Sequence, residues 1–273
     1  MRFDLREIMD LAEKGGFAVP AFNVYNMETV LGVMQASEQA NAPVMFMMYS
    51  SLFDSMEGKL LSAIIREAVD TMKTPAVFHL DHGAGVPQVM RALRWGASGV
   101  MIDASACPLE ENIATSAAVV KMAKAVGVSV EGELGHIGMA SDGVGSDYTR
   151  VDEAVRYVEE TGVDALAIMV GTAHGHYKKA PVLAIDRIRQ IHAATDVHLV
   201  LHGGSGVPDD QVRAAVEAGI RKMNFGTDLC CAYMNTLHAG DPALTLVTAA
   251  MEKPTQAVKE YALSKISLLG AGK

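Results

Sequence analysis

Short apolar runs bounded by turn residues recur at eight places along the chain. Segments of this length, with glycine or proline nearby, predict strands that are buried on both faces. The eight predicted strands span residues 17–24, 43–48, 75–80, 99–102, 128–133, 165–170, 197–201 and 220–225.

Segments with helical periodicity lie between these runs. They span residues 28–39, 60–72, 86–95, 110–125, 152–160, 185–192 and 209–218. The acidic pair Asp209 and Asp210 suits the positive end of a helix, and Gly127, Gly162 and Gly219 are placed to end helices. The chain therefore alternates strand and helix throughout.

Strand–helix alternation with doubly buried strands predicts a parallel sheet covered by helices. Eight such units point to a closed (β/α)8 TIM barrel, an α/β fold that forms a single domain over residues 1–273. An open doubly wound sheet is the alternative, but no Gly-x-Gly-x-x-Gly segment follows the first strand.

Most of the predicted strands end at, or run into, polar residues that a buried strand does not need for packing. In a barrel, the carboxyl ends of all strands meet at one rim, so these residues would converge on one pocket. They are Asn23, Asp81, His82, Asp103, Glu133, His174, His202 and Asn224.

Three of these residues, His82, His174 and His202, supply imidazoles from separate strands. Such a set suits a catalytic Zn²⁺ with an open coordination position, which would act as a Lewis acid on a carbonyl oxygen. Asp81 is interpreted as a general acid or base, and the alternative is a partner that fixes the tautomer of a ligand. Glu133 would orient the metal, bind it in an alternative position or stabilise substrate hydroxyls.

Glycine-rich segments follow the seventh and eighth predicted strands, at residues 203–206 and 224–227. Loops at these two places form the usual phosphate site of barrels. Backbone N–H groups at a helix start, with the Ser205 and Thr227 hydroxyls, would hold a dianion. The alternative is that the glycines only form tight turns.

Composition excludes several classes of protein. Lys and Arg total 23 against 32 Asp and Glu, a net charge of −9, which argues against a nucleic-acid partner. No apolar run is long enough to span a membrane, and charged residues occupy the N-terminal positions where a signal peptide would be apolar. The three cysteines match neither a disulfide framework nor a cysteine zinc site. We therefore expect a cytoplasmic protein.

Six sequence blocks together resemble the class II, zinc-dependent fructose-bisphosphate and tagatose-bisphosphate aldolases. The resemblance follows the chain in order over nearly its whole length. The blocks are residues 22–26 (FNVYN), 79–83 (HLDHG), 131–135 (EGELG), 171–175 (GTAHG), 201–206 (LHGGSG) and 224–228 (NFGTD).

The resemblance implies reversible aldol cleavage of a ketose, such as a ketose 1,6-bisphosphate or a ketose phosphate, into a dihydroxyacetone-type donor and an aldehyde, through an enediolate that Zn²⁺ stabilises. It makes Asp81 the group that takes the C4 hydroxyl proton and Asn224 the group that holds the enediolate. Glu133 becomes an alternative metal ligand or a substrate organiser, and Asn23 a substrate contact. Substrate phosphate and a monovalent cation, Na⁺ or K⁺, are expected near Gly175, Gly203, Ser205 and Thr227.

Two segments depart from the family pattern. Ser141 stands where family aldolases have the glutamate that moves the carbon-bound proton of the donor, so Asp142 or Asp147 would replace it, or the reaction differs. Tyr49 ends the second strand, where small polar residues are usual. An aldolase of unphosphorylated or unusual sugars is therefore one alternative.

Two further alternatives keep the metal pocket. A sugar epimerase or isomerase would reprotonate the same enediolate, and a non-enzymatic subunit would keep the site for stability. The family resemblance implies a homodimer or homotetramer, and the segment 229–246, poor in charge, would suit the contact between subunits.

Overall fold

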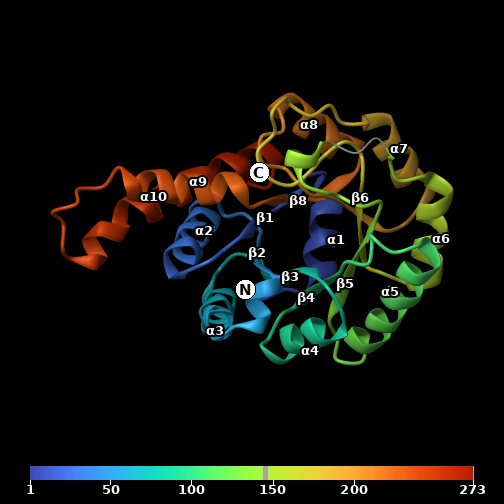
Figure 1. Ribbon diagram of the computed structural model, residues 1–273, viewed down its shortest axis with the longest axis horizontal. Coiled ribbons are helices and arrows are strands. Elements are labelled where there is room, and N and C mark those ends of the chain that lie inside the picture. The colour runs from blue at the N-terminus through green and yellow to red at the C-terminus, as the bar shows by residue number, and fades with distance from the viewer. Residues whose placement is uncertain (144–146, 273) are drawn as a thin grey trace.

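The computed structural model describes residues 1–143 and 147–272, and its strands close into a parallel barrel (Figure 1). Closure is direct, because β1 pairs with β8 as well as with β2. The predicted barrel is confirmed and the open sheet is excluded. The strands are β1 (Val19–Asn23), β2 (Val44–Tyr49), β3 (Ala76–Gly83), β4 (Gly99–Ile102), β5 (Ser129–Leu134), β6 (Ala165–Ile168), β7 (His198–Leu201) and β8 (Ile220–Phe225).

Helices cover the outside of the barrel and follow the strands in turn. The seven predicted helices are present, with ends shifted by a few residues. They are α2 (Met27–Ala40), α3 (Met56–Thr71), α4 (Val86–Arg94), α5 (Leu109–Lys124), α6 (Val151–Thr161), α7 (Ile185–Ala194) and α8 (Asp209–Ala218). Short 3-10 helices add η1 (Ser50–Asp54) and η2 (Ala140–Asp142).

The predicted strand ends agree with the observed ones to within two residues, except at the end of the third strand. The sixth strand stops at Ile168, because the Met169 N–H donates to Thr149 Oγ1 at 2.9 Å and only at 3.4 Å to the Leu134 carbonyl of β5, while the Met169 carbonyl accepts from the Thr149 N–H. The third strand continues beyond Leu80 to Gly83, and its register against β4 shifts between these two residues.

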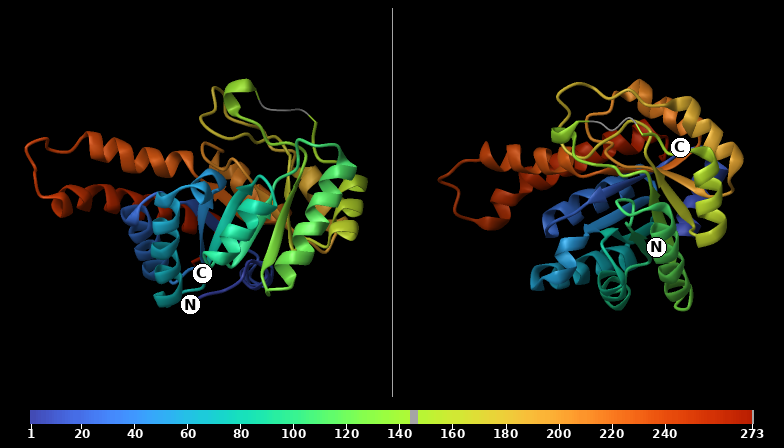
Figure 2. Two further views of the ribbon diagram at one scale, coloured as in Figure 1. Left: turned by 60° about the horizontal axis from the view of Figure 1, so that its bottom comes forward. Right: turned by 45° about the vertical axis from the view of Figure 1, so that its right-hand side comes forward.

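Three helices were not predicted. The helix α1 (Leu5–Gly15) begins at an Asp4–Glu7 capping box, and its apolar face packs with inward-facing side chains of the strands. The helices α9 (Thr227–His238) and α10 (Val247–Leu269) follow β8 and project from the barrel as an arm (Figures 1 and 2). Within the described residues, no helix is long and apolar enough to cross a membrane.

The barrel interior changes from apolar to polar along the strands. Near the amino ends it is filled by Val19, Met45 and Val77, packed against α1. Towards the carboxyl ends, Glu131 and Lys222 are fully buried. Because alternate residues of a strand point inward, this polar layer continues directly into the residues that face the rim.

Candidate active site

A cavity of about 680 Å³ opens at the carboxyl ends of the strands. His202 and Glu133 do not line it directly, because both are fully buried beneath its wall. The other predicted site residues line the cavity, and they are Asn23, Asp81, His82, His174, Gly175, Gly203, Ser205, Asn224 and Thr227.

His82 reaches the cavity through an unusual backbone conformation. It lies at φ +49°, where L-residues other than glycine are rare, at the register shift of β3. Strain of this kind persists only where the surrounding structure holds it, and it is common at functional sites. The irregularity aims the Asp81 and His82 side chains at one region instead of at opposite faces of the strand.

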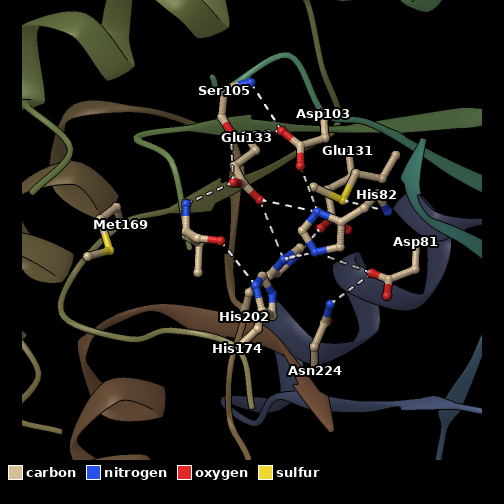
Figure 3. Close-up of polar contacts among 12 residues, drawn as sticks. Asp81, His82, Asp103, Ser105, Glu131, Glu133, Met169, His174, His202 and Asn224 are labelled. Atoms are coloured by element: carbon tan, nitrogen blue, oxygen red, sulfur yellow. Dashed lines mark hydrogen bonds and ion pairs between the residues drawn. The ribbon is translucent and has the colours of Figure 1, made fainter. Parts of the chain in front are cut away.

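The three predicted imidazoles lie together, with ring centroids 4.7 to 5.8 Å apart (Figure 3). Each ring has one nitrogen beside an acceptor: His82 Nδ1 is 2.7 Å from Asp103, His174 Nδ1 is 3.1 Å from the Ile137 carbonyl, and His202 Nε2 is 2.9 Å from Glu131. In a neutral ring, an acceptor there fixes the N–H on that nitrogen and leaves the opposite nitrogen as a lone-pair donor.

The donor set fits a zinc ion. The free nitrogens of His82 and His202 are 3.0 Å apart, close to the separation of about 3.3 Å for two imidazoles on tetrahedral Zn²⁺. Glu133 Oε2 is buried without a hydrogen-bond partner among the described residues, 3.5 Å from His202 Nδ1. A cation held by the three imidazoles would place a positive charge next to this oxygen.

His82, Asp103 and Glu133 form a second group in which ligand atoms lie within 4.8 Å of one another. Burial raises the pKa of Asp103, but hydrogen bonds from His82 and Ser105 outweigh it, so the pKa lies well below its usual range. Burial and the charge of Asp103 raise the pKa of Glu133 to about 8. The two carboxyl groups therefore differ in protonation at neutral pH in the metal-free protein.

Asp81 is held at both oxygens. Asn23 Nδ2 donates to Oδ2 at 2.7 Å, and Asn224 Nδ2 donates to Oδ1 at 3.3 Å. Burial raises the pKa of Asp81, but the charges of His82, His202 and Lys222 and the bond from Asn23 hold it below its usual value. Asp81 is thus a carboxylate at neutral pH, 4.0 Å from His82 Nε2.

The predicted phosphate loops lie side by side on the rim. Gly203 takes φ +65°, and a Cβ there would come 2.3 Å from the Ala173 carbonyl oxygen, so only glycine fits. The Gly206 N–H donates to Asp228, which leaves it unavailable to a ligand. Ser205 and Thr227 line the cavity at the N-terminus of α9, whose dipole favours an anion.

The two departures from the family pattern lie on the described rim. Tyr49 lines the cavity with its ring centroid 6.1 Å from that of His82. Ser141 is exposed in η2 and Asp147 is exposed beyond it, whereas the Asp142 side chain lies outside the described residues. Replacement of the missing glutamate by Asp142 or Asp147 stays a prediction.

Several polar residues of the site were not predicted. Ser105 Oγ donates to Glu133 and lies 3.3 Å from Nδ1 of His136, which lines the cavity. Glu131 and Lys222 are buried deeper and contact His202 and Asn224. A signal for the buried pair was present in the sequence, because Glu131 and Lys222 each precede a predicted site residue by two positions and so share its face of the strand.

Known proteins resemble this chain over most of its length. The family fructose-bisphosphate aldolase class-II matches residues 3–273. The 6-phospho-5-dehydro-2-deoxy-D-gluconate aldolase of Halalkalibacterium halodurans is 36% identical over 270 residues, which cover 96% of this chain and 94% of that protein. The sulfofructosephosphate aldolase of Alkalicoccus urumqiensis is 36% identical over 233 residues, 84% of this chain and 81% of that protein.

The YdjI aldolase from Escherichia coli K12 has a similar crystal structure. The TM-score is 0.91 at 32% sequence identity, with 100% of this chain and 98% of that chain covered. The barrel with three imidazoles gathered at its rim suits a metal-dependent enzyme, and the matches identify the family. The chain belongs to the class II fructose-bisphosphate aldolase family, whose members are zinc-dependent, and it is an aldolase, a lyase.

Zinc binding is expected to depend on pH through His82. Burial lowers the pKa of His82, but Asp81, Asp103 and Glu133 outweigh it and raise the pKa to about 9 in the metal-free protein. Zinc must displace this proton below pH 9, so its apparent affinity should rise by up to about tenfold per pH unit from pH 6 to 9. Competition with a chromophoric chelator measures the affinity.

The control for this titration is His192→Ala, which changes a histidine outside the cavity and should leave the profile unchanged. His82→Ala should weaken zinc binding strongly and flatten the profile. An apparent affinity that does not change between pH 6 and 9 in the unaltered protein would contradict this account.

Proposed function

We propose that this aldolase cleaves and condenses a ketose phosphate, with a dihydroxyacetone-type donor and an aldehyde as the two fragments. The observation that carries the proposal is the position of Asp81, a buried carboxylate held by two asparagines beside three converging imidazoles. Zn²⁺ is the ion we assign to His82, His174 and His202, where it would polarise the ketose C2 carbonyl.

Asp81 acts as the base in the cleavage direction. It accepts the proton of the C4 hydroxyl, the C3–C4 bond breaks, and its electron pair moves towards the C2 carbonyl as C4 becomes the aldehyde carbon. The lowered pKa keeps Asp81 ionised for this step at neutral pH. In condensation the proton returns from Asp81 to the aldehyde oxygen.

Asn23 and Asn224 hold the carboxylate in place, and Asn224 also faces the cavity beside it. We assign Asn224 to the enediolate oxygen and Glu133 to the metal or to substrate hydroxyls. Ser205, Thr227, Gly175 and Gly203 are assigned to the phosphate, which the names of the two phosphosugar aldolases support. A Na⁺ or K⁺ ion beside the phosphate stays a prediction.

Asp81→Asn should strongly slow cleavage while zinc is retained. The amide cannot accept the hydroxyl proton, so kcat should fall by about 10²- to 10⁴-fold across a panel of ketose 1-phosphates. The exposed Asp196→Asn serves as the matched control and should keep full turnover. Unchanged kcat in zinc-loaded Asp81→Asn would remove Asp81 from the reaction.

Ser205→Ala tests the phosphate site. The loss of a hydroxyl hydrogen bond to a dianion should raise KM for a phosphorylated ketose by about tenfold or more. Turnover of the corresponding free ketose should not change, and the exposed Ser264→Ala should leave both substrates unaffected. Equal effects on phosphorylated and free ketoses would show that the loop at 203–206 only forms a turn.

We infer that the protein is a cytoplasmic homodimer or homotetramer. The arm of α9 and α10 carries exposed apolar side chains at its far end, where Leu246 is 63% and Val247 71% exposed. Sedimentation velocity over a range of concentrations should show a dimer or tetramer, and replacement of both residues by serine should favour a smaller species. A monomer at all concentrations would contradict the inference.

A further inference from the structure

A charged pair lies inside the barrel, beneath the residues assigned to the reaction. Glu131 on β5 and Lys222 on β8 are both fully buried, and Lys222 Nζ is 2.9 Å from Glu131 Oε2. Burial of two charges costs free energy, and apolar replacements of such pairs are often neutral or stabilising. Fold stability alone therefore does not explain the pair, and its other contacts indicate a role.

Glu131 determines the tautomer of His202. Its Oε1 lies 2.9 Å from His202 Nε2, and an ionised carboxylate only accepts hydrogen bonds. The ring proton is therefore on Nε2, and Nδ1 carries the lone pair. Nδ1 is the nitrogen that lies 3.0 Å from His82 Nε2, among the assigned zinc ligands.

Lys222 determines the orientation of the Asn224 amide. Its ammonium group only donates, so the Asn224 atom at 2.7 Å must be the carbonyl oxygen Oδ1. The amide nitrogen then points the other way, towards Asp81 Oδ1 at 3.3 Å. Asp81 and Lys222 therefore select the same amide orientation, and without Lys222 a flipped amide would lose one of the two contacts that disfavour it.

His79 on β3 restricts the pair from the opposite side. His79 Nε2 is 3.3 Å from Glu131 Oε2, and its ring is fully buried against Gly99, where a Cβ would come 2.6 Å from Nδ1. Glu131 is thereby surrounded by His79, His202 and Lys222. Burial raises its pKa, but Lys222 and the two histidines outweigh burial and hold the pKa well below its usual value.

We infer that Glu131 and Lys222 are positioning residues, which align a metal ligand and the amide beside the catalytic carboxylate from below the cavity. Glu131 acts through His202, and Lys222 acts through Asn224. Because Glu131 and Lys222 are ion-paired with each other, one buried pair orients both the His202 ring and the Asn224 amide. The role of Lys222 rests on the proposed function. The role of Glu131 concerns metal binding and does not require that the reaction be known.

Two double variants separate the role of Glu131 from that of Lys222 without leaving a lone buried charge. In Glu131→Gln with Lys222→Met, the amide oxygen can still accept from His202, so zinc affinity should stay within about threefold of the unaltered protein. The free Asn224 amide should lower kcat by about 10- to 100-fold. In Glu131→Leu with Lys222→Met, His202 also loses its acceptor, and zinc affinity should fall by about 10- to 100-fold.

A double-mutant cycle with Asn224→Ala tests whether Lys222 acts through that residue. The Glu131→Gln, Lys222→Met pair should lower kcat in the parent but add little to the defect of Asn224→Ala. If the pair lowered kcat as much in Asn224→Ala as in the parent, the proposed role of Lys222 would be overturned. Wild-type zinc affinity and turnover in both double variants would overturn the whole inference and leave the pair as interior packing.

The tautomer itself is measurable in the unaltered protein. Histidine ¹⁵N NMR of the metal-free protein should show His202 protonated at Nε2 and not at Nδ1. A proton on Nδ1 would overturn the proposed role of Glu131, and this test does not depend on whether the variants fold. Zinc affinity and the NMR tautomer need no substrate. Absence of aldol cleavage in the unaltered protein would therefore contradict the proposed function but not the role of Glu131.

Discussion

Carboxylates buried at the carboxyl ends of the strands orient almost every functional side chain of this protein. Asp103 accepts from His82, and Glu131 lies against His202, so two of the three imidazoles have their free nitrogens aimed at one point. Asp81 is in turn held by Asn23 and Asn224. Each of these acceptors has its donor on a different strand of the barrel or just beyond its carboxyl end, so contacts across the barrel fix the direction of the side chains.

Closure of the barrel brings these carboxylates and their donors together. Parallel strands place their carboxyl ends at one rim, and the apolar lower half of the interior, sealed by α1, excludes water from the polar layer above it. In such surroundings an unpaired charge is costly, so ionised groups lie close to opposite charges or donors. Among the described residues, Glu133 Oε2 has no hydrogen-bond partner, and it faces the place that we assign to zinc.

The periodicity of the sequence predicts the eight strands, because a strand buried on both faces must be apolar along its whole length. It also predicts that His82, His174 and His202 converge, because strand order alone determines which ends meet. The pairing of Glu131 with Lys222 was not predicted, since the two residues are 91 positions apart and their contact depends on strand register across the barrel.

The C-terminal arm was missed for a different reason. The helix α10 contains Pro254, a residue that disfavours a helix interior, and it lies outside the strand–helix repeat. Its packing against α2 compensates for the lost backbone bond. The strained backbone at His82 was likewise not predicted, because tertiary contacts hold it and local sequence preference does not favour it.

We propose that the trihistidine site and Asp81 together break a carbon–carbon bond. ¹H NMR of the zinc-loaded protein with a ketose 1-phosphate tests it directly, with the chelated protein as the control. We expect the ketose signals to disappear and two fragments, an aldehyde and dihydroxyacetone phosphate, to appear in equal amounts. Conversion into a single isomeric ketose or aldose, with the carbon chain intact, would contradict it.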